Sequence, residues 1–325
     1  MMDRVHITDV APRDGLQNQA VHASTAHKLA LVERLAAAGI GSVEITSFVS
    51  PKAVPQMADA ADLLPQVQAR LPALRSSVLV PNRKGLERAH AAGAHEIAVV
   101  LSATETMNRK NINMGLDEAI AVSEQTLQAA LALGLRTRAY VAVAFDCPFE
   151  GETPLDRVVD LSLRMTKAGA HEIVIADTIG SASPGMVKER MGALTQAIAA
   201  DKLAVHFHDT RGMGAANAWA ALEAGIRRFD ASVGGIGGCP FAPGAAGNLA
   251  TEDLVLLAER SGFSTGISLP GLLDAIDLAQ EVLQRPLGGR SIAWLRKQRD
   301  SASGTHLKRP QGLHQSPTQL APPPG

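Results

Sequence analysis

The chain repeats one pattern eight times: a short apolar segment typical of a strand, followed by a longer segment with helical periodicity. The apolar segments are nearly continuous, as expected of parallel strands that are covered by helices on both faces. The predicted pairs of strand and helix are 5–10 with 24–38, 42–46 with 51–69, 76–80 with 83–92, 96–101 with 116–133, 136–144 with 154–168, 172–176 with 184–199, 204–208 with 212–224, and 228–233 with 252–261.

Glycines mark the ends of several predicted helices. Gly39, Gly93, Gly169 and Gly225 each follow an alanine near the end of a helical segment, where a left-handed residue commonly closes the helix. Eight regular units of this kind predict an α/β fold, a closed (β/α)8 TIM barrel in a single domain. An open, doubly wound parallel sheet is the alternative.

The predicted catalytic barrel domain covers residues 1–290, and residues 291–325 form a C-terminal extension. Residues 301–325 include five prolines and show no apolar periodicity. Such a composition cannot bury enough apolar surface to fold, so we expect disorder after residue 301.

Composition and charge exclude several classes of partner. The formal net charge is −1, which favours neither a nucleic-acid nor a membrane partner. The sequence contains no apolar run long enough to span a bilayer, and no signal-peptide pattern precedes the first strand. The two cysteines, Cys147 and Cys239, lie far apart and lack metal-ligand spacing. These features predict a soluble, cytoplasmic protein with reduced thiols.

Polar residues gather where predicted strands end. In parallel barrels the catalytic groups lie on the loops after the strands, so these positions are the candidate site. They are Arg13 and Asp14 after the first strand, Glu44 in the second, Asp177 after the sixth, His206 and His208 in the seventh, and the glycine-rich loop from Gly234 to Asn248 after the eighth.

His206 and His208 are two residues apart on a strand, so their side chains point to the same face. Asp14 follows the first strand, which closure of the barrel brings next to the last two strands, and Asn248 offers an amide oxygen. Oxygen and nitrogen ligands without a thiolate suit Mg²⁺ or Mn²⁺ better than structural zinc. Two alternatives remain: the two-histidine, one-carboxylate site of iron oxygenases, and a pair in which one histidine is hydrogen-bonded in the core and the other is exposed.

Arg13 lies beside Asp14 and can bind a carboxylate or carbonyl oxygen through its planar guanidinium group. The alternative is a structural salt bridge to Glu44 or Asp177, and either carboxylate could instead act as a base. Cys239 stands among glycines in the long loop, which allows a thiol to reach a ligand when the loop closes. A buried cysteine with no chemical role is the alternative.

Several strings resemble the hydroxymethylglutaryl-CoA lyase family, over about residues 5 to 290. They are ITDVAPRDGLQNQ, VEITSFVSPKAVPQM, CPFEG at residues 147–151, DTIG, HFHDT and GGIGGCPFAPGAAGNLATEDL. The resemblance implies a (β/α)8 barrel that binds Mg²⁺ or Mn²⁺ through Asp14, His206, His208 and Asn248. It places the family's catalytic groups on Arg13, Glu44, Asp177 and Cys239, and a tyrosine near the substrate on Tyr140.

The activity implied by this resemblance is cleavage of 3-hydroxy-3-methylglutaryl-CoA to acetyl-CoA and acetoacetate, a step of leucine degradation. A homodimer is also implied, with an acyl-CoA as the small-molecule partner. Where many members read Tyr-Gly-Gln after His-Asp-Thr, this chain has Arg211, Gly212 and Met213, a difference that bears on the acyl group.

Three other functions fit parts of the sequence. One is a lyase for a related 3-hydroxyacyl-CoA such as citramalyl-CoA, and another is a Claisen-type acyl transferase on the same barrel. Transferases of this kind usually carry a further C-terminal regulatory domain, whereas this chain ends soon after the barrel. The third is a protein that binds a metal or CoA without catalysis.

Overall fold

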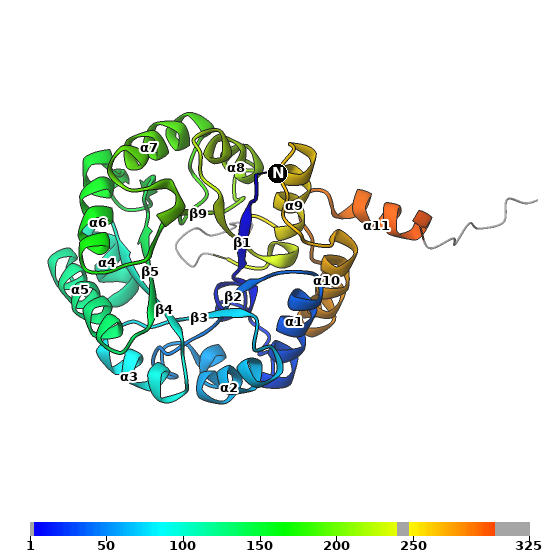
Figure 1. Ribbon diagram of the computed structural model, residues 1–325, viewed down its shortest axis with the longest axis horizontal. Coiled ribbons are helices and arrows are strands. Elements are labelled where there is room, and N and C mark those ends of the chain that lie inside the picture. The colour runs from blue at the N-terminus through cyan, green and yellow to red at the C-terminus, as the bar shows by residue number, and fades with distance from the viewer. Residues whose placement is uncertain (1–2, 239–246, 303–325) are drawn as a thin grey trace, which may run out of the picture.

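The computed structural model describes residues 3–238 and 247–302. Eight parallel strands close into a barrel in the order β1-β10-β9-β8-β5-β4-β3-β2, and helices surround them in an outer ring (Figure 1). The predicted TIM barrel is therefore confirmed. The barrel strands are β1 (His6–Asp9), β2 (Ser42–Ser47), β3 (Arg75–Leu79), β4 (Glu96–Ser102), β5 (Arg136–Ala142), β8 (Glu172–Asp177), β9 (Leu203–Phe207) and β10 (Arg228–Ala231).

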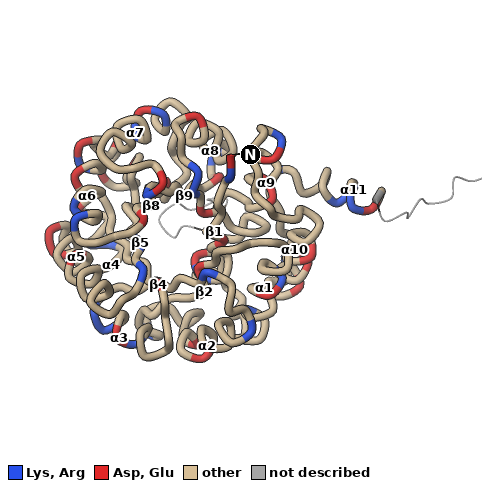
Figure 2. Tube along the Cα trace, viewed as in Figure 1, with Lys and Arg blue, Asp and Glu red and all other residues tan. Residues whose placement is uncertain are grey.

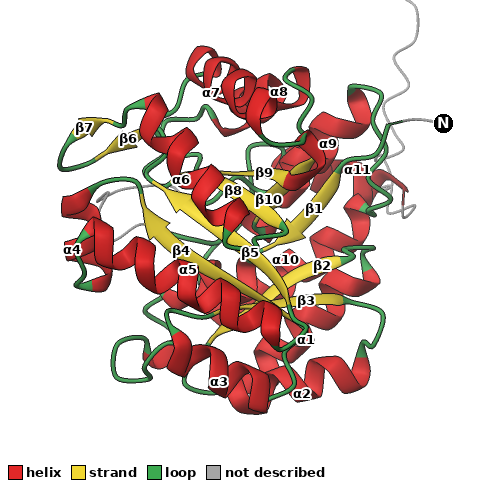
Figure 3. Cartoon of the chain, turned by 60° about the vertical axis from the view of Figure 1, so that its left-hand side comes forward, coloured by secondary structure: helices red, strands yellow, loops and turns green. Residues whose placement is uncertain are grey.

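Helices surround the barrel strands (Figure 3), and most of their buried apolar residues belong to the hydrophobic core. The helices are α1 (Thr25–Ala37), α2 (Ala60–Arg70), α3 (Arg83–Ala91), α4 (Glu105–Ile112), α5 (Leu116–Ala132), α6 (Leu155–Lys167), α7 (Pro184–Ala197), α8 (Gly214–Glu223), α9 (Thr251–Arg260), α10 (Leu269–Leu283) and α11 (Ile292–Ala302). Acidic and basic residues alternate around the outer ring, which agrees with the net charge of −1 (Figure 2). None of the described helices is both long and apolar enough to cross a membrane.

The structure differs from the predicted elements in several places. A helix was predicted over residues 51–69, but only the short 3₁₀ turn η2 (Pro55–Met57) and α2 form there. Prolines at positions 51 and 55 explain the difference, since the residue before a proline avoids helical geometry. Three further elements were not predicted. They are helices α4 and α10 and a hairpin of two short strands, β6 (Asp146–Cys147) and β7 (Gly151–Glu152).

The C-terminal extension begins as a helix. Figure 1 shows α11 projecting from the ring, and its arginines Arg296 and Arg299 bind Asp277 of α10 at 2.8 and 3.0 Å. The extension is therefore ordered up to residue 302, and the residues predicted to be disordered beyond it lie outside the described part of the chain.

The four glycines predicted to close helices do so. Their φ angles are +96° at Gly39, +85° at Gly93, +106° at Gly169 and +88° at Gly225, all in the left-handed region. At the other end of α1, the Ser24 hydroxyl accepts a hydrogen bond from the His27 amide at 3.2 Å, as expected of a capping serine.

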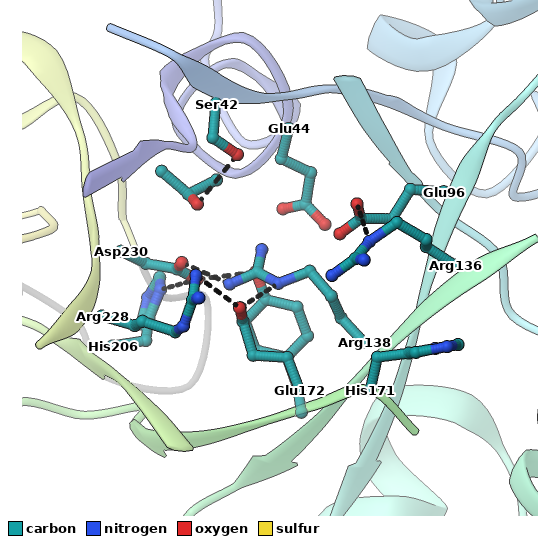
Figure 4. Close-up of polar contacts among 12 residues, drawn as sticks. Ser42, Glu44, Glu96, Arg136, Arg138, His171, Glu172, His206, Arg228 and Asp230 are labelled. Atoms are coloured by element: carbon teal, nitrogen blue, oxygen red, sulfur yellow. Dashed lines mark hydrogen bonds and ion pairs between the residues drawn. The ribbon is translucent and has the colours of Figure 1, made fainter. Parts of the chain in front are cut away.

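The barrel interior contains charged groups as well as apolar ones. A small apolar cluster of Ala98, Tyr140, Val174 and Ala204 lies between strands β4, β5, β8 and β9. Around it, carboxylates and arginines point inward from the same strands and from β2 and β10 (Figure 4). Buried charges are stable only when they are paired, so these side chains must be held in fixed partnerships.

Replacing Gly39 by alanine is expected to lower the free energy of unfolding by more than the ~1–2 kcal/mol that left-handed geometry costs a residue with a side chain. A Cβ atom there would also lie 2.5 Å from the Gly266 carbonyl oxygen. Urea unfolding of Gly39→Ala, Gly225→Ala and Gly41→Ala separates the two effects.

Gly225 has a positive φ but no atom within 4 Å of the added Cβ, so its variant should show the backbone cost alone. Gly41 has neither a positive φ nor a close neighbour and serves as the control. Equal stability of the Gly39 and Gly41 variants would contradict this account.

Candidate active site

Asp14, His206 and His208 meet at the ends of strands that are far apart in sequence. His206 lies in β9 and His208 one residue beyond it, and their ring centroids are 5.3 Å apart. Asp14 lies in the short π-helical turn η1 (Ala11–Gly15) that follows β1. One ligand atom from each of the three residues falls within 4.8 Å of the others. The arrangement is a possible site for a metal ion.

Asn248 lies beside these three residues and could be a fourth metal ligand. Its amide nitrogen donates to Asp14 Oδ2 at 2.9 Å and to the Ile236 carbonyl at 3.0 Å, and neither bond uses the side-chain Oδ1. Among the described residues, neither this buried Oδ1 nor His208 Nδ1 has a hydrogen-bond partner. Buried polar atoms are rarely left unpaired, and a divalent cation with oxygen and nitrogen ligands would account for them. The residues present therefore fit a metal ion.

The protonation states of His208 and Asp14 also suit the binding of a metal cation. Burial, assisted by the neighbouring His206, lowers the pKa of His208 to about 4, so its ring is neutral and free to act as a ligand. Burial alone would raise the pKa of Asp14, but Arg13 and the two histidines hold it below its usual value. Asp14 is therefore an anion, as a metal-binding carboxylate must be.

Arg13 is fixed between two carboxylates. Its Nε and Nη2 atoms lie 2.7 and 2.5 Å from Glu44 Oε2, and its Nη1 lies 2.8 Å from Asp14 Oδ1. Burial by itself would lower the pKa of Arg13, but these carboxylates keep it above its usual value. Glu44 is fully buried, and its Oε1 has no hydrogen-bond partner among the described residues. A permanently charged guanidinium is thus held rigidly at the edge of the possible metal site.

Asp177 does not share this arrangement. It ends β8, and its carboxylate accepts hydrogen bonds from the amides of Ser181 and Ala182 at 2.8 and 3.2 Å. The predicted alternative of a salt bridge from Arg13 to Asp177 is not found; in the described chain, the partners of Arg13 are Glu44 and Asp14. Burial raises the pKa of Asp177 to about 6, despite those amide bonds. Cys239 lies outside the described residues.

Below the histidines, a network of buried polar side chains occupies the barrel interior (Figure 4). Asp230 accepts hydrogen bonds from the Tyr140 hydroxyl at 2.6 Å and from Arg138 at 2.7 Å. The Oδ2 atom that accepts the tyrosine bond also lies 3.4 Å from Nδ1 of His206. A carboxylate behind a metal-binding histidine orients the ring and increases its basicity. Accordingly, although burial opposes it, Asp230 and Asp14 raise the pKa of His206.

Tyr140 therefore lies beneath the possible metal site. Its ring is edge-on to His206 with centroids 6.2 Å apart, and the guanidinium carbons of Arg13 and Arg138 lie 5.9 and 5.3 Å from its centroid. Neither Arg138 nor Asp230 was predicted from the sequence, although a signal was present. Both are charged residues inside predicted parallel strands, where both faces are buried and a charge needs a partner.

A third residue missed from the sequence is Asp9, which is fully buried at the end of β1. Its carboxylate accepts hydrogen bonds from the Ala11 amide at 2.9 Å, the Val233 amide at 3.0 Å and the Thr251 hydroxyl at 2.7 Å. These donors begin η1, the glycine-rich loop and α9, respectively. One carboxylate thus fixes the segments that bring Asp14 and Asn248 together.

We expect Asp9→Ala to lower the free energy of unfolding by roughly 3 kcal/mol or more, because three buried donors lose their acceptor. It should also weaken Mn²⁺ binding, measured by electron paramagnetic resonance, because η1 no longer holds Asp14 in place. Asp62→Ala, on an exposed face of α2, is the control. A variant with the stability and Mn²⁺ affinity of the parent would show that Asp9 does not organise the site.

Comparison with known proteins places this chain in a family. The chain is 42% identical to the hydroxymethylglutaryl-CoA lyase of Bacillus subtilis over 289 residues, covering 89% of this chain and 96% of the relative. It is 43% identical to the human mitochondrial hydroxymethylglutaryl-CoA lyase over 282 residues, covering 87% of this chain and 86% of the relative.

Solved structures give the same result. The crystal structure of the Bacillus subtilis HMG-CoA lyase matches with a TM-score of 0.87 at 41% identity, covering 90% of this chain and 98% of that one. An Acinetobacter baumannii HMG-CoA lyase in complex with coenzyme A and 3-methylmalate matches with a TM-score of 0.85 at 36% identity, covering 97% and 98%. The HMGL-like family model matches residues 4–279. The resemblance noted in the sequence is thus confirmed, and the chain belongs to the HMGL-like family.

Proposed function

We propose that this chain is a carbon–carbon lyase that cleaves 3-hydroxy-3-methylglutaryl-CoA to acetyl-CoA and acetoacetate by a retro-Claisen reaction. The observation that carries the proposal is the cluster of Asp14, His206 and His208 with Arg13 bonded to its edge at 2.8 Å. The relatives of about 42% identity that are named as lyases for this substrate support it.

A divalent cation, Mg²⁺ or Mn²⁺, would be held by Asp14, His206, His208 and Asn248. When bound, it would lower the pKa of the substrate's tertiary hydroxyl, as metal ions do for water. The hydroxyl proton would pass to Asp14 or His206, the titratable groups on the Arg13 side of the cluster. Loss of that proton lets the carbon–carbon bond break, leaving its electron pair on the thioester as an enolate.

Arg13 is the group best placed to stabilise this negative charge. It is held by Glu44 and Asp14 before substrate binds, so it need not reorganise during the reaction. Preorganised donors of this kind typically contribute ~3–4 kcal/mol to transition-state stabilisation. Glu44 would act through Arg13, and Asp177 and Tyr140 would line the end of the site where acetoacetate forms.

Cys239 would donate the proton that converts the enolate carbon to the methyl group of acetyl-CoA. Its neighbours Gly237 and Gly238 allow the backbone to approach a ligand closely. Its role rests on the sequence resemblance and on the need for an acid at this step. The proton that the base took from the hydroxyl then replaces the one that Cys239 gave up, so acetoacetate and acetyl-CoA form with no net gain or loss of protons.

The identity of the acyl group is the part of the proposal most open to test. Arg211 Nη1 donates to the Ile179 carbonyl at 3.4 Å, and Met213 is 43% exposed, both in the loop after His208. Their departure from the family pattern favours a related 3-hydroxyacyl-CoA, such as citramalyl-CoA, as the second candidate substrate. We further propose that the enzyme acts as a homodimer in leucine degradation.

We expect purified protein to release acetyl-CoA from 3-hydroxy-3-methylglutaryl-CoA, to lose this activity in EDTA, and to regain it with Mg²⁺ or Mn²⁺. The assay is run in parallel with citramalyl-CoA and a longer-chain 3-hydroxyacyl-CoA. A higher kcat/KM for citramalyl-CoA would keep the lyase chemistry but change the substrate. Full activity after removal of all divalent ions would refute the proposal.

Cys239→Ala should retain metal and substrate binding but lose turnover by a factor of ~10²–10⁴, the usual contribution of a positioned acid. Cys147→Ala is a matched control, because Cys147 is a buried thiol that accepts a hydrogen bond from the Thr104 hydroxyl at 3.1 Å. Steady-state kinetics with isotopic labelling of acetyl-CoA in D₂O measures the effect. Unchanged turnover in Cys239→Ala would remove the thiol from the mechanism.

A further inference from the structure

The barrel has a cavity at the end opposite the candidate active site. It has a volume of about 160 Å³ and lies at the N-terminal ends of the strands, whereas Asp14 and His208 follow strand C-termini. His6, Arg75, Glu172 and Arg228 are the first residues of β1, β3, β8 and β10 and line this cavity. No step of the proposed reaction uses this end of the barrel.

Positive charge predominates in its lining. Arg4, Arg75, Arg138 and Arg228 line the cavity, but Glu172 is the one carboxylate among the residues that line it. Glu172 is shared: it lies 2.7 Å from Arg138, 3.6 Å from Arg228 and 3.7 Å from Arg75. Figure 4 shows Glu172 together with Arg138 and Arg228. One carboxylate cannot neutralise several guanidinium groups.

Partners outside the cavity do not remove the excess. Glu96 binds Arg75 with both oxygens, at 2.6 and 2.7 Å, and lies 3.6 Å from Arg136. Asp230 binds Arg138 from the other side. Within the described chain, Arg4 has no carboxylate within ion-pairing distance. An uncompensated guanidinium therefore remains at the mouth of the cavity.

His6 reports the electric field at this end of the barrel. Burial lowers its pKa, and the charges of Arg228, Arg4 and Arg75 lower it further, with Glu172 as the opposing charge. The arginines therefore disfavour a further cation at His6, and the same field attracts an anion.

We propose that this cavity binds a compact, doubly charged oxyanion such as inorganic phosphate. Guanidinium groups bind phosphate and carboxylate oxygens through paired hydrogen bonds, and the arginines come from four different strands or strand ends around one space. Its volume equals that of about five waters, which suits a small oxyanion and is below the ~300 Å³ of typical drug-sized sites. A whole coenzyme A molecule does not fit there.

Isothermal titration of phosphate into the full-length, Mg²⁺-loaded protein tests the proposal, with chloride at matched ionic strength as the reference. We expect saturable binding by the parent chain and a Kd about tenfold weaker in Arg4→Gln, the loss expected for one charged hydrogen-bonding partner. Arg83→Gln, which removes an exposed arginine paired with Glu87 on α3, should bind as the parent does.

Malonate titrated in the same way distinguishes a carboxylate occupant from a phosphate. Tighter binding of malonate that is also weakened in Arg4→Gln would assign the cavity to small dicarboxylates. No saturable binding by the parent chain, or equal binding by the parent and Arg4→Gln, would overturn the proposal. Because Arg4 has no side-chain partner among the described residues, its variant should fold normally, which circular dichroism checks.

A site-specific measurement tests whether the heat measured in the phosphate titration comes from this cavity and not from the active site. The pKa of His6, followed by NMR and assigned with His6→Gln, should rise when phosphate is present, since the added negative charge favours the imidazolium form. The groups that face His6 are Arg228, Arg4, Arg75 and Glu172. An unchanged His6 pKa at saturating phosphate would place the anion elsewhere and would rule out phosphate binding in this cavity.

Discussion

The buried carboxylate of Asp9 is the constraint on which the geometry of the active site depends. Each of its three hydrogen bonds goes to a different segment: the turn that carries Arg13 and Asp14, the start of the glycine-rich loop, and the first residue of α9. Closure of the barrel brings the ends of these segments near one another. Closure alone leaves their relative positions variable, because the segments are loops. A shared acceptor fixes the positions of the three segments relative to one another, because one segment cannot move without breaking its hydrogen bond to Asp9. The donors around the possible metal site are therefore positioned by a group that touches none of them.

Much of this arrangement could be predicted from the sequence, for identifiable reasons. The alternation of strand and helix defines the barrel, and strand geometry places His206 and His208 on one face. Closure then brings Asp14 close to them. Helix α4 and the hairpin of β6 and β7 were missed because they are insertions after barrel strands, and the repeat gives no place for them. Their role is local: the Thr106 amide donates to Glu150 at 2.6 Å, which ties α4 to the hairpin.

The residues that the sequence did not reveal are those whose meaning depends on their neighbours across the barrel. Arg138 and Asp230 are 92 residues apart along the chain and lie 2.7 Å apart in the structure. Neither has a recognisable motif, and each would be unstable where it lies without the other. Asp9 is similar, since its three donors come from positions that only the closed sheet brings within reach. A pattern can indicate that a buried charge needs a partner, but only the register of the strands identifies it.

Arg138 has a consequence for the molecule as a whole. Its guanidinium group joins Glu172, at the starts of the strands, to Asp230, which lies against His206 near their ends. Charged side chains therefore connect the two openings through the interior of the barrel. A chain of alternating charges runs along the axis through a medium of low polarity, where electrostatic effects decay slowly. The two openings are therefore linked by fixed charges, and their electrostatic environments are not independent.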